Sequence, residues 1–337
     1  MKILVTGNLG YVGSHLTELL IQGGHKVIGC DLNLFPKAMC GNLTEPSKQL
    51  FQDYRELSSD DLNGVEAIAH LAALSNDPLG KLDSQLTHEV NGQGTITLAK
   101  LAKSNGVKSF AFASSCSIYG SLGEHARTEQ DPTNPLSDYA KSKLFAEQGL
   151  SNLADDEFKV YLLRNATAYG ASKVFRTDLV INDLTSSLFA TGIAEVLSDG
   201  SPWRPFIHAF DMARVFMLFL ESSPAHLSGK AVNIGFTSEN YQVRSVGDLI
   251  LRNFEGGKLV FSLKPSNDPR DYKVDFSLFE SNFPNFKAEF PIELGIPHLK
   301  NWLKQICFSQ SDRNEGRYVR LKELDIEKIN YEPKTHS

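Results

Sequence analysis

The first 31 residues constrain the fold of this chain more than any other segment. Residues 2–6 (KILVT) form a short apolar run, as a strand buried on both faces of a parallel sheet requires. Three glycines follow at intervals of three residues, and residues 14–21 then carry leucines at helical spacing. A second apolar run, residues 26–31 (KVIGCD), ends in an acid. Strand, glycine turn, helix, strand and acid in this order predict a βαβ unit that binds a dinucleotide.

The glycine turn and the acid also indicate which dinucleotide is bound. Gly7, Gly10 and Gly13 let backbone N–H groups approach a pyrophosphate at the positive end of the following helix. Asp31 lies 18 residues after Gly13, where its carboxylate can accept both ribose hydroxyls of NAD. Its charge would repel the 2′-phosphate of NADP, and no Arg or Lys immediately follows it. We therefore expect NAD as the cofactor; the alternative is a purely structural glycine turn in an α/β protein.

Composition excludes several classes of protein. The chain has 337 residues, 41% of them apolar and 22% charged, which is enough to bury a full core. The net charge of −6 provides no global basic field for nucleic acid or an anionic membrane. The four cysteines have neither a CxxC pair nor metal-ligand spacing, and no apolar stretch approaches about 20 residues. We expect a soluble cytoplasmic protein with no metal, no nucleic-acid partner and no membrane span.

Two further segments contain candidate catalytic residues. Residues 107–113 (VKSFAFA) read as a buried strand, and SSCSIYG follows at its carboxyl end, where open parallel sheets bind ligands. Tyr139 and Lys143 are four residues apart in a helix that we expect to start near Ser137, so they share one face. A tyrosine with its usual pKa of about 10 is a poor base, but a lysine one turn away favours the phenolate. The alternative interpretation is that Tyr139 and Lys143 are two exposed side chains on the surface of this helix.

These segments together resemble the extended short-chain dehydrogenase/reductase superfamily, and within it the NAD-dependent epimerase/dehydratase family. The resemblance rests on TGxxGxxG at the N-terminus, HLAA at residues 70–73, NGQGT from Asn91, the SSxxxYG strand end and YxxxK. It covers about 300 residues. It implies an α/β fold: a Rossmann-type doubly wound parallel sheet with a smaller, interleaved α/β lobe that binds the substrate. It further implies NAD as cofactor, a nucleoside-diphosphate sugar as substrate, and a homodimer.

The resemblance also assigns roles to individual residues. Tyr139 would remove a proton from a sugar hydroxyl, Ser115 would hydrogen-bond the reacting oxygen, and Lys143 would also bind the nicotinamide ribose. Asp53 would lie near the adenine. The cofactor-binding residues that it implies come from the glycine turn, the strand ends and the helix starts: Gly7, Gly10, Tyr11, Val12, Gly13, Asp31, Asp53, Leu71, Ala72, Ala73, Asn91 and Lys143.

The residues after Ser115 discriminate between the reactions of this family. Members that eliminate water carry an acid pair there, whereas this chain has Cys116 and Ser117, neither of them an acid at neutral pH. Dehydration and decarboxylation are therefore disfavoured, which leaves C4 epimerisation or reduction of a 4-keto sugar. A non-catalytic NAD-sensing protein is a third possibility. Cys116 itself is either a small packed residue or a second base, although the family places such a cysteine one position later.

On the substrate side, Thr167 stands where the family usually has an asparagine, and Asn165 lies two residues earlier on the same strand face. Arg204 resembles a position that binds the nucleotide phosphate, for which the planar guanidinium is well suited, and Arg270 resembles one that reaches the nucleotide diphosphate or ribose. Asn182 resembles a further diphosphate contact, with a helix-surface amide as the alternative. The substrate-binding residues implied are Cys116, Ser117, Asn165, Thr167, Asn182, Arg204 and Arg270.

The order of these motifs predicts two interleaved lobes without a linker. Residues 1–168, with about 208–235, would bind NAD, and residues 169–207 and 236–306 would form the substrate-binding lobe. The remainder, residues 307–337, is a polar tail in which the apolar residues from Tyr318 to Ile326 allow one short amphipathic helix. Packing of this tail onto the body or a partner subunit, and disorder, are the alternatives.

Overall fold

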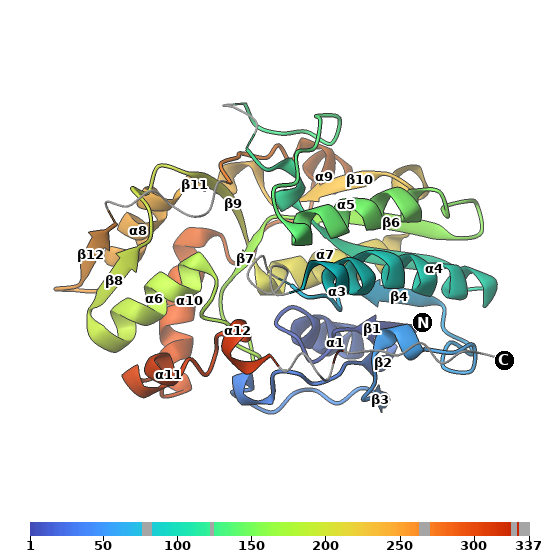
Figure 1. Cartoon of the computed structure of the whole chain (residues 1–337), viewed down its shortest axis with the longest axis horizontal. Helices are drawn as coiled ribbons and strands as arrows, with labels where there is room; N and C mark the ends of the chain where they lie inside the picture. The colour runs from blue at the N-terminus through green and yellow to red at the C-terminus, as the bar shows by residue number, and fades with distance from the viewer. Residues whose placement is uncertain (76–82, 122–124, 263–269, 325–328, 330–337) are drawn as a thin grey trace.

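The computed structural model describes residues 1–75, 83–121, 125–262, 270–324 and 329. Within these residues, seven parallel strands form the central sheet in the order β10-β6-β5-β4-β1-β2-β3 (Figure 1). The order reverses between β1 and β4, as in the predicted doubly wound sheet, so that prediction is confirmed. The strands are β1 (Lys2–Thr6), β2 (Lys26–Cys30), β3 (Lys48–Leu50), β4 (Ala67–His70), β5 (Ser109–Ser115), β6 (Lys159–Asn165) and β10 (Ala231–Ile234).

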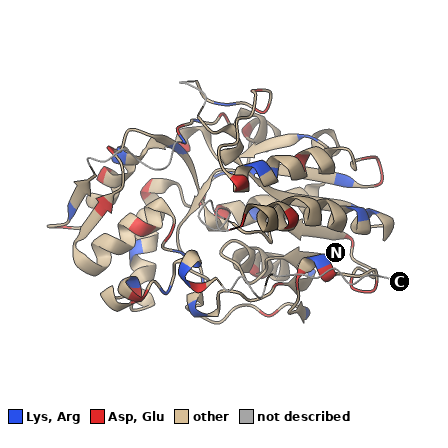
Figure 2. Ribbon diagram, in the orientation of Figure 1, with Lys and Arg blue, Asp and Glu red and all other residues tan. Residues whose placement is uncertain are grey.

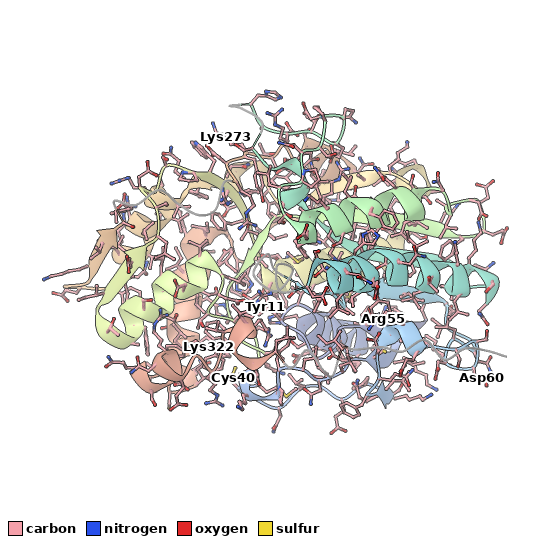
Figure 3. The ribbon with its side chains drawn as sticks, viewed as in Figure 1. Tyr11, Cys40, Arg55, Asp60, Lys273 and Lys322 are labelled. Carbon is pink, nitrogen blue, oxygen red and sulfur yellow. The ribbon has the colours of Figure 1, made fainter. Side chains whose placement is uncertain are left out.

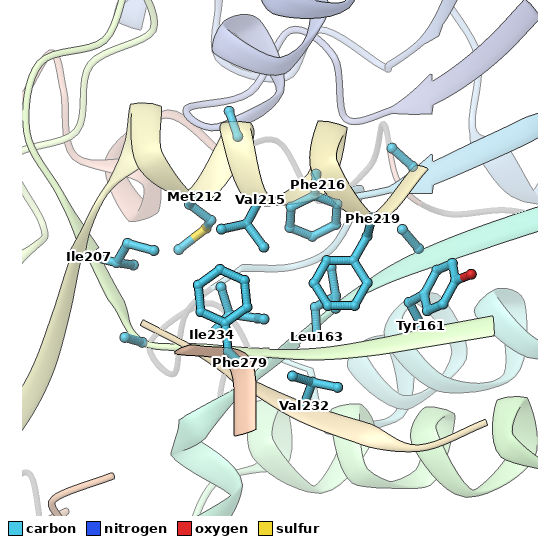
Figure 4. Close-up of a cluster of buried hydrophobic side chains, with 14 of the residues drawn as sticks. Tyr161, Leu163, Ile207, Met212, Val215, Phe216, Phe219, Val232, Ile234 and Phe279 are labelled. Atoms are coloured by element: carbon cyan, nitrogen blue, oxygen red, sulfur yellow. The ribbon is translucent and has the colours of Figure 1, made fainter. Parts of the chain in front are cut away.

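Helices cover both faces of this sheet, because successive side chains of a strand point to opposite faces. On one face, α1 (Gly13–Gln22) and α7 (Ala209–Ser222) pack with Ile3 and Val5 of β1. On the other face, α4 (Gly94–Ser104) and α5 (Asp138–Ser151) pack with Leu4. Figure 4 shows the first of these cores, where Met212, Val215, Phe216 and Phe219 of α7 lie against side chains of β6 and β10.

A second region lies beside the carboxyl edge of the large sheet (Figure 1). In the described part of the chain it has a three-stranded sheet, β11-β9-β7, and a parallel pair, β12-β8. A third core joins these strands to α6, α8 and α10. The bounds are β7 (Thr167–Tyr169), β8 (Ile193–Val196), β9 (Trp203–His208), β11 (Asn240–Gln242), β12 (Lys258–Phe261), α6 (Val180–Thr191), α8 (Val243–Leu251) and α10 (Ile292–Gln305). The short helix α9 (Ser277–Asn282) instead packs through Phe279 with the core of the large sheet.

The chain passes from the large sheet to this region and back again. Residues 209–234, which contain α7 and β10, pack with the large sheet, although the strands on both sides of them in the sequence belong to the second region. The division into two interleaved lobes depends on this arrangement, and its boundaries stay a prediction. Short helical turns connect the elements: α3 (Ser84–His88), η1 (Pro36–Ala38), η2 (Tyr54–Glu56), η3 (Glu89–Gln93), η4 (Cys116–Tyr119), η5 (Ala225–Leu227) and η6 (Thr237–Glu239).

The C-terminal segment has a short helix inside the range from Tyr318 to Ile326, where one was expected, and a second short helix before that range. Up to Leu324, the structure has two short helices, α11 (Gln310–Glu315) and α12 (Arg320–Glu323). Ser309 begins α11 with a capping box closed by Asp312, and Gly316 ends it before the apolar residues start, so the two parts cannot form one helix. Ile326, which the expected helix included, lies outside the described residues.

Positively and negatively charged residues are interspersed along the ribbon in both regions (Figure 2). Among the helices that the structure describes, none has the length and apolar character needed to cross a membrane.

Candidate active site

The predicted cofactor and catalytic segments meet at the carboxyl edge of the large sheet. Thr6 of β1 is in register with His70 of β4, and Ser115 of β5 is in register with Asn165 of β6. The strand order reverses at β1 and β4, and ligands bind at such a switch point in open α/β sheets.

The glycine turn between β1 and α1 leaves no room for side chains. A Cβ on Gly13 would lie 2.0 Å from the carbonyl oxygen of Gly7, and a Cβ on Gly7 would lie 2.8 Å from the backbone nitrogen of Ala72. Gly7 also has a φ of +74°, which side chains disfavour. The turn therefore presents bare backbone at the start of α1, which is what binding of a pyrophosphate requires.

Asp31 lies against this turn. Its carboxylate accepts hydrogen bonds from the backbone N–H groups of Leu9 (3.1 Å) and Asn33 (2.8 Å). Burial raises the pKa of Asp31, and these two donors oppose that effect. The two hydrogen bonds fix the carboxylate at the end of β2, beside the glycine turn, where the ribose contact is predicted.

Asp53 is held by a neighbour two residues away. Arg55 donates from Nε to one carboxylate oxygen (3.0 Å) and from Nη2 to the other (2.8 Å), and both side chains are less than 10% exposed. The backbone N–H of Arg55 donates to the same carboxylate. The predicted contact of Asp53 with adenine stays a prediction, and the structure adds Arg55 as its fixed partner.

The HLAA segment is fixed from both sides. The His70 ring bonds to Thr6 Oγ1 through Nδ1 (2.7 Å) and to Thr95 Oγ1 through Nε2 (2.9 Å). Burial, together with the nearby Lys143, holds the pKa of His70 well below its usual value, so the ring is neutral. Asn91 accepts from the N–H of Leu74 and donates to its carbonyl. Between these fixed ends, the predicted contacts Leu71, Ala72 and Ala73 are half-buried.

The catalytic pair lies in the first two turns of α5. The Ser137 side chain caps this helix by accepting from the N–H of Ala140 (3.2 Å), which confirms the expected helix start. Lys143 Nζ lies 5.7 Å from the centre of the Tyr139 ring and 4.7 Å from that of Phe112. Burial lowers the pKa of Lys143 to about 7. Burial disfavours the ammonium of Lys143 when it stands alone, and a phenolate at Tyr139 would supply the opposite charge that stabilises it.

A buried polar network joins α5 to β6, and no motif in the sequence indicated it. Arg164 of β6 donates from Nη2 to Glu147 of α5 (2.7 Å) and from Nη1 to the Tyr119 hydroxyl (3.0 Å). Ser114 donates to Glu147 as well, and Tyr119 donates to Asn233. The position of Glu147, four residues after Lys143 on the same helix, was the available signal.

The three residues at the end of β5 and the start of η4 lie in different surroundings. Ser115 Oγ accepts from the N–H of Ser117 (3.1 Å), and Ser117 Oγ is buried without a hydrogen-bond partner. The Cys116 thiol is 1% exposed and faces the Arg164 carbonyl (3.1 Å). Burial raises the pKa of Cys116 well above its usual value, so the thiol stays protonated. This geometry supports the interpretation of Cys116 as a packed residue and gives no support to a substrate contact.

Asn182 is neither exposed nor on a helix surface, so that alternative is wrong. Its Oδ1 accepts from the N–H of Gly170 (2.8 Å), and its Nδ2 donates to the Tyr11 hydroxyl (3.0 Å) and to the Arg176 carbonyl (2.9 Å). Tyr11 in turn donates to the Gly170 carbonyl (2.7 Å). The amide thus joins the glycine turn to the second region, and its predicted diphosphate contact stays a prediction.

The other predicted substrate residues come from β6, β7, β9 and the segment after residue 269. Asn165 donates to the Ser114 carbonyl (3.0 Å), while its Oδ1 is buried without a partner; Thr167 is half-buried. Arg204 lies 5.5 Å from the Tyr272 ring centre. Because Tyr272 N–H donates to the Trp203 carbonyl, the chain just after Arg270 runs beside the start of β9. Arg204 and Arg270 therefore belong to one neighbourhood.

Comparison with known proteins agrees with this geometry. Residues 3–235 match the NAD dependent epimerase/dehydratase family. This chain belongs to that family. A UDP-glucose 4-epimerase from Bacillus subtilis is 29% identical over 279 residues, which cover 72% of this chain and 79% of the relative.

Solved structures of two enzymes share the fold of this chain. MoeE5 in complex with UDP-glucose and NAD is 26% identical with a TM-score of 0.77, covering 90% of this chain and 99% of that one. An NAD-dependent NDP-hexosamine 5,6-dehydratase, TunA, has a TM-score of 0.81 at 24% identity, covering 90% and 98%. Epimerases and dehydratases thus both resemble this member of the epimerase/dehydratase family, and family membership alone leaves the reaction open.

As a member of this family, the chain is an NAD-dependent enzyme of the extended short-chain dehydrogenase type. The residues present fit NAD: the bare glycine turn can hold the pyrophosphate, Asp31 can accept from a ribose, and Lys143 and Tyr139 lie close together in α5, where contacts to the nicotinamide ribose are predicted. Among the described residues, no group of three metal-ligating side chains forms a site for an ion.

Proposed function

We propose that this enzyme is a nucleotide-sugar 4-epimerase. The observation that carries the proposal is the pairing of Tyr139 with a buried Lys143 beside a strand end, Ser115 to Ser117, that holds no acid. Such a site contains one base and one hydrogen-bond donor to the sugar. Oxidation and re-reduction at a single carbon need no more than these.

Each residue has a defined part in that reaction. Tyr139 takes the proton of the C4 hydroxyl. It returns this proton after the keto sugar has rotated to present its opposite face to the cofactor. Lys143, whose pKa is about 7, stabilises the phenolate, and Ser115 donates a hydrogen bond to the reacting oxygen. When bound, NAD would accept the hydride from C4 and later return it. His70 stays neutral beneath Lys143 and so adds no competing charge.

The surroundings of Cys116 and Ser117 argue against loss of water. Elimination needs one acid to protonate the leaving hydroxyl and one base to take the neighbouring proton. The Cys116 thiol has a raised pKa and faces the Arg164 carbonyl, away from solvent. The Ser117 hydroxyl is not an acid at neutral pH.

We infer a nucleoside diphosphate sugar as substrate. Arg204 and Arg270 lie in one neighbourhood and offer guanidinium groups suited to a diphosphate. MoeE5 is a relative whose structure holds UDP-glucose, which supports the substrate class without selecting the base or the sugar of this chain. The homodimer stays a prediction that light scattering would test.

The test is incubation of the purified enzyme with a panel of nucleotide sugars, with and without added NADH, followed by NMR of the products. We expect interconversion of C4 epimers without net consumption of NADH. Stoichiometric loss of NADH with a 4-keto substrate would instead identify a 4-ketoreductase that uses the same residues. Formation of a deoxy-keto or unsaturated sugar would overturn the interpretation of Cys116 and Ser117.

A further inference from the structure

The C-terminal segment, residues 309–324, is built into the body of the molecule beside the cofactor site. Arg313 donates to Asp183 (2.8 Å), which fixes α11 on α6. The Tyr318 carbonyl accepts from the N–H of Thr177 (3.0 Å), and the Tyr318 ring is buried against Phe175. These contacts hold the segment along residues 174–178 and position α12.

The same segment is fixed to the loop that follows Asp31. Arg317 Nε donates to the Lys37 carbonyl (2.9 Å), and the Lys37 N–H donates to Glu323 (2.7 Å). Figure 3 labels Lys322 of α12 and Cys40 of this loop close together, below Tyr11. Because Cys40 Sγ donates to the Ser172 carbonyl (3.5 Å) and Ser172 Oγ to the Tyr11 carbonyl (2.8 Å), the loop links α12 to the glycine turn.

Arg320 is the residue of α12 that this arrangement buries. It is 3% exposed, its guanidinium lies 4.1 Å from the centre of the Phe35 ring, and Nη1 has no hydrogen-bond partner. A buried donor without a partner is costly, and more so on a charged group. Burial and the neighbouring Arg176 lower the pKa of Arg320 to about 10. Asp178, Glu323 and Asp31 lie near enough to oppose this shift, but Nη1 keeps no hydrogen-bond partner among the described residues.

The groups around Arg320 indicate what would satisfy it. Arg176 is engaged by Asp178 (2.9 Å) and Ser75 (3.2 Å), and it is a second cation close to Arg320. Asp31 already accepts two backbone hydrogen bonds. Arg320, with the Asp178-paired Arg176 near it and the bare backbone of the glycine turn close by, has surroundings suited to a phosphate anion.

We propose that Arg320 binds the pyrophosphate of NAD, so that a residue from the C-terminal segment completes the cofactor site. This inference concerns the cofactor alone and does not depend on which reaction the enzyme performs on a sugar. The 2′-phosphate of NADP is a less suitable partner because the carboxylate of Asp31 lies at the ribose. The diphosphate of the substrate has its own arginines near β9.

The experiment measures binding to the full chain freed of cofactor. We expect Arg320→Gln to weaken NAD and ADP-ribose by about 10- to 100-fold, the effect of one lost charge-assisted hydrogen-bonded contact. The affinity for adenosine, which has no phosphate, and for UDP should stay within about twofold of the wild type. Lys322→Gln is the matched control, because Lys322 is an exposed cation two residues away on α12, and it should change none of the four affinities.

Further variants separate binding from folding. Arg320→Lys keeps the charge and should recover part of the affinity for ADP-ribose, whereas Arg320→Met keeps contact with Phe35 and should not. Unchanged affinity of Arg320→Gln for NAD and ADP-ribose would overturn the proposal. So would an equal loss of adenosine binding, which would mean a structural role. A loss of NADP binding alone, in an enzyme that binds NADP as well as NAD, would assign Arg320 to the 2′-phosphate instead and refute the proposal.

Discussion

The two ends of the cofactor site are built in different ways. At the nicotinamide end, Ser115, Tyr139 and Lys143 come from β5 and α5, two consecutive long elements of the chain. On the other side of the site, Asp31, the predicted ribose contact, and Arg320, the proposed pyrophosphate contact, come from nearly opposite ends of the sequence and lie close to each other. When the residues of a site come from one strand and the helix after it, they lie close together in the sequence and can be recognised as a motif. A binding surface assembled from distant segments becomes visible only when the chain is folded.

We expect the largest effect from Tyr139→Phe, which removes the hydroxyl of the predicted base and changes the volume of the side chain very little. We expect turnover to fall by about 10²- to 10⁴-fold, the usual contribution of a general acid–base group. NAD affinity, measured by titration, should stay within about twofold, since the ring remains in place. A variant that keeps near-normal turnover would show that Tyr139 is not the base.

At the pyrophosphate, Gly13→Ala tests whether bare backbone is required. The new Cβ would meet the Gly7 carbonyl at 2.0 Å, so the turn must shift at a cost of about 1–3 kcal/mol. We expect NAD affinity to fall about tenfold or more and the melting temperature to decrease. Gly41→Ala is the control, because its Cβ meets nothing closer than Lys173 Cγ at 3.8 Å. Equal effects of the two substitutions would contradict the prediction.

The buried Lys143 should make the free energy of unfolding depend on pH. Its pKa is about 7 when folded against 10.5 for the ordinary side chain, so between these values the unfolded chain binds more protons. Lys143 therefore lowers the free energy of unfolding near pH 7, and this cost disappears as the pH approaches 10. We expect cofactor-free Lys143→Met to melt higher than the wild type at pH 7, with an advantage that shrinks by pH 10. An advantage that is constant with pH would refute the lowered pKa.

The smallest effect concerns the link between the two regions. Tyr11→Phe removes the hydroxyl that donates to the Gly170 carbonyl and accepts from Asn182. We expect a loss of about 1–3 kcal/mol in the free energy of unfolding, because a buried amide donor loses its partner. Denaturant unfolding of this variant, of Asn182→Ala and of the double variant would test the coupling, and strictly additive losses would show that the two side chains act independently.

The sequence predicts the sheet well because its signals are local. An apolar run, a glycine turn and an acid within residues 2–31 dictate one βαβ unit, and Ser137 marks the start of α5. Patterns also located Asn182, but they could not show that its amide is buried among groups of three segments. Arg320 lies in a polar stretch without a motif, so no pattern distinguished it from the exposed Lys322.

The placement of α12 has a consequence for synthesis of the protein. The ribosome releases the glycine turn first, and N-terminal parts of a chain generally begin to fold as they emerge. The edge strand β10 is synthesised only after the second region has been started, and Arg320 is synthesised later than both. A nascent chain thus carries an incomplete nucleotide site until α12 has been made, and full retention of the cofactor has to wait for that segment.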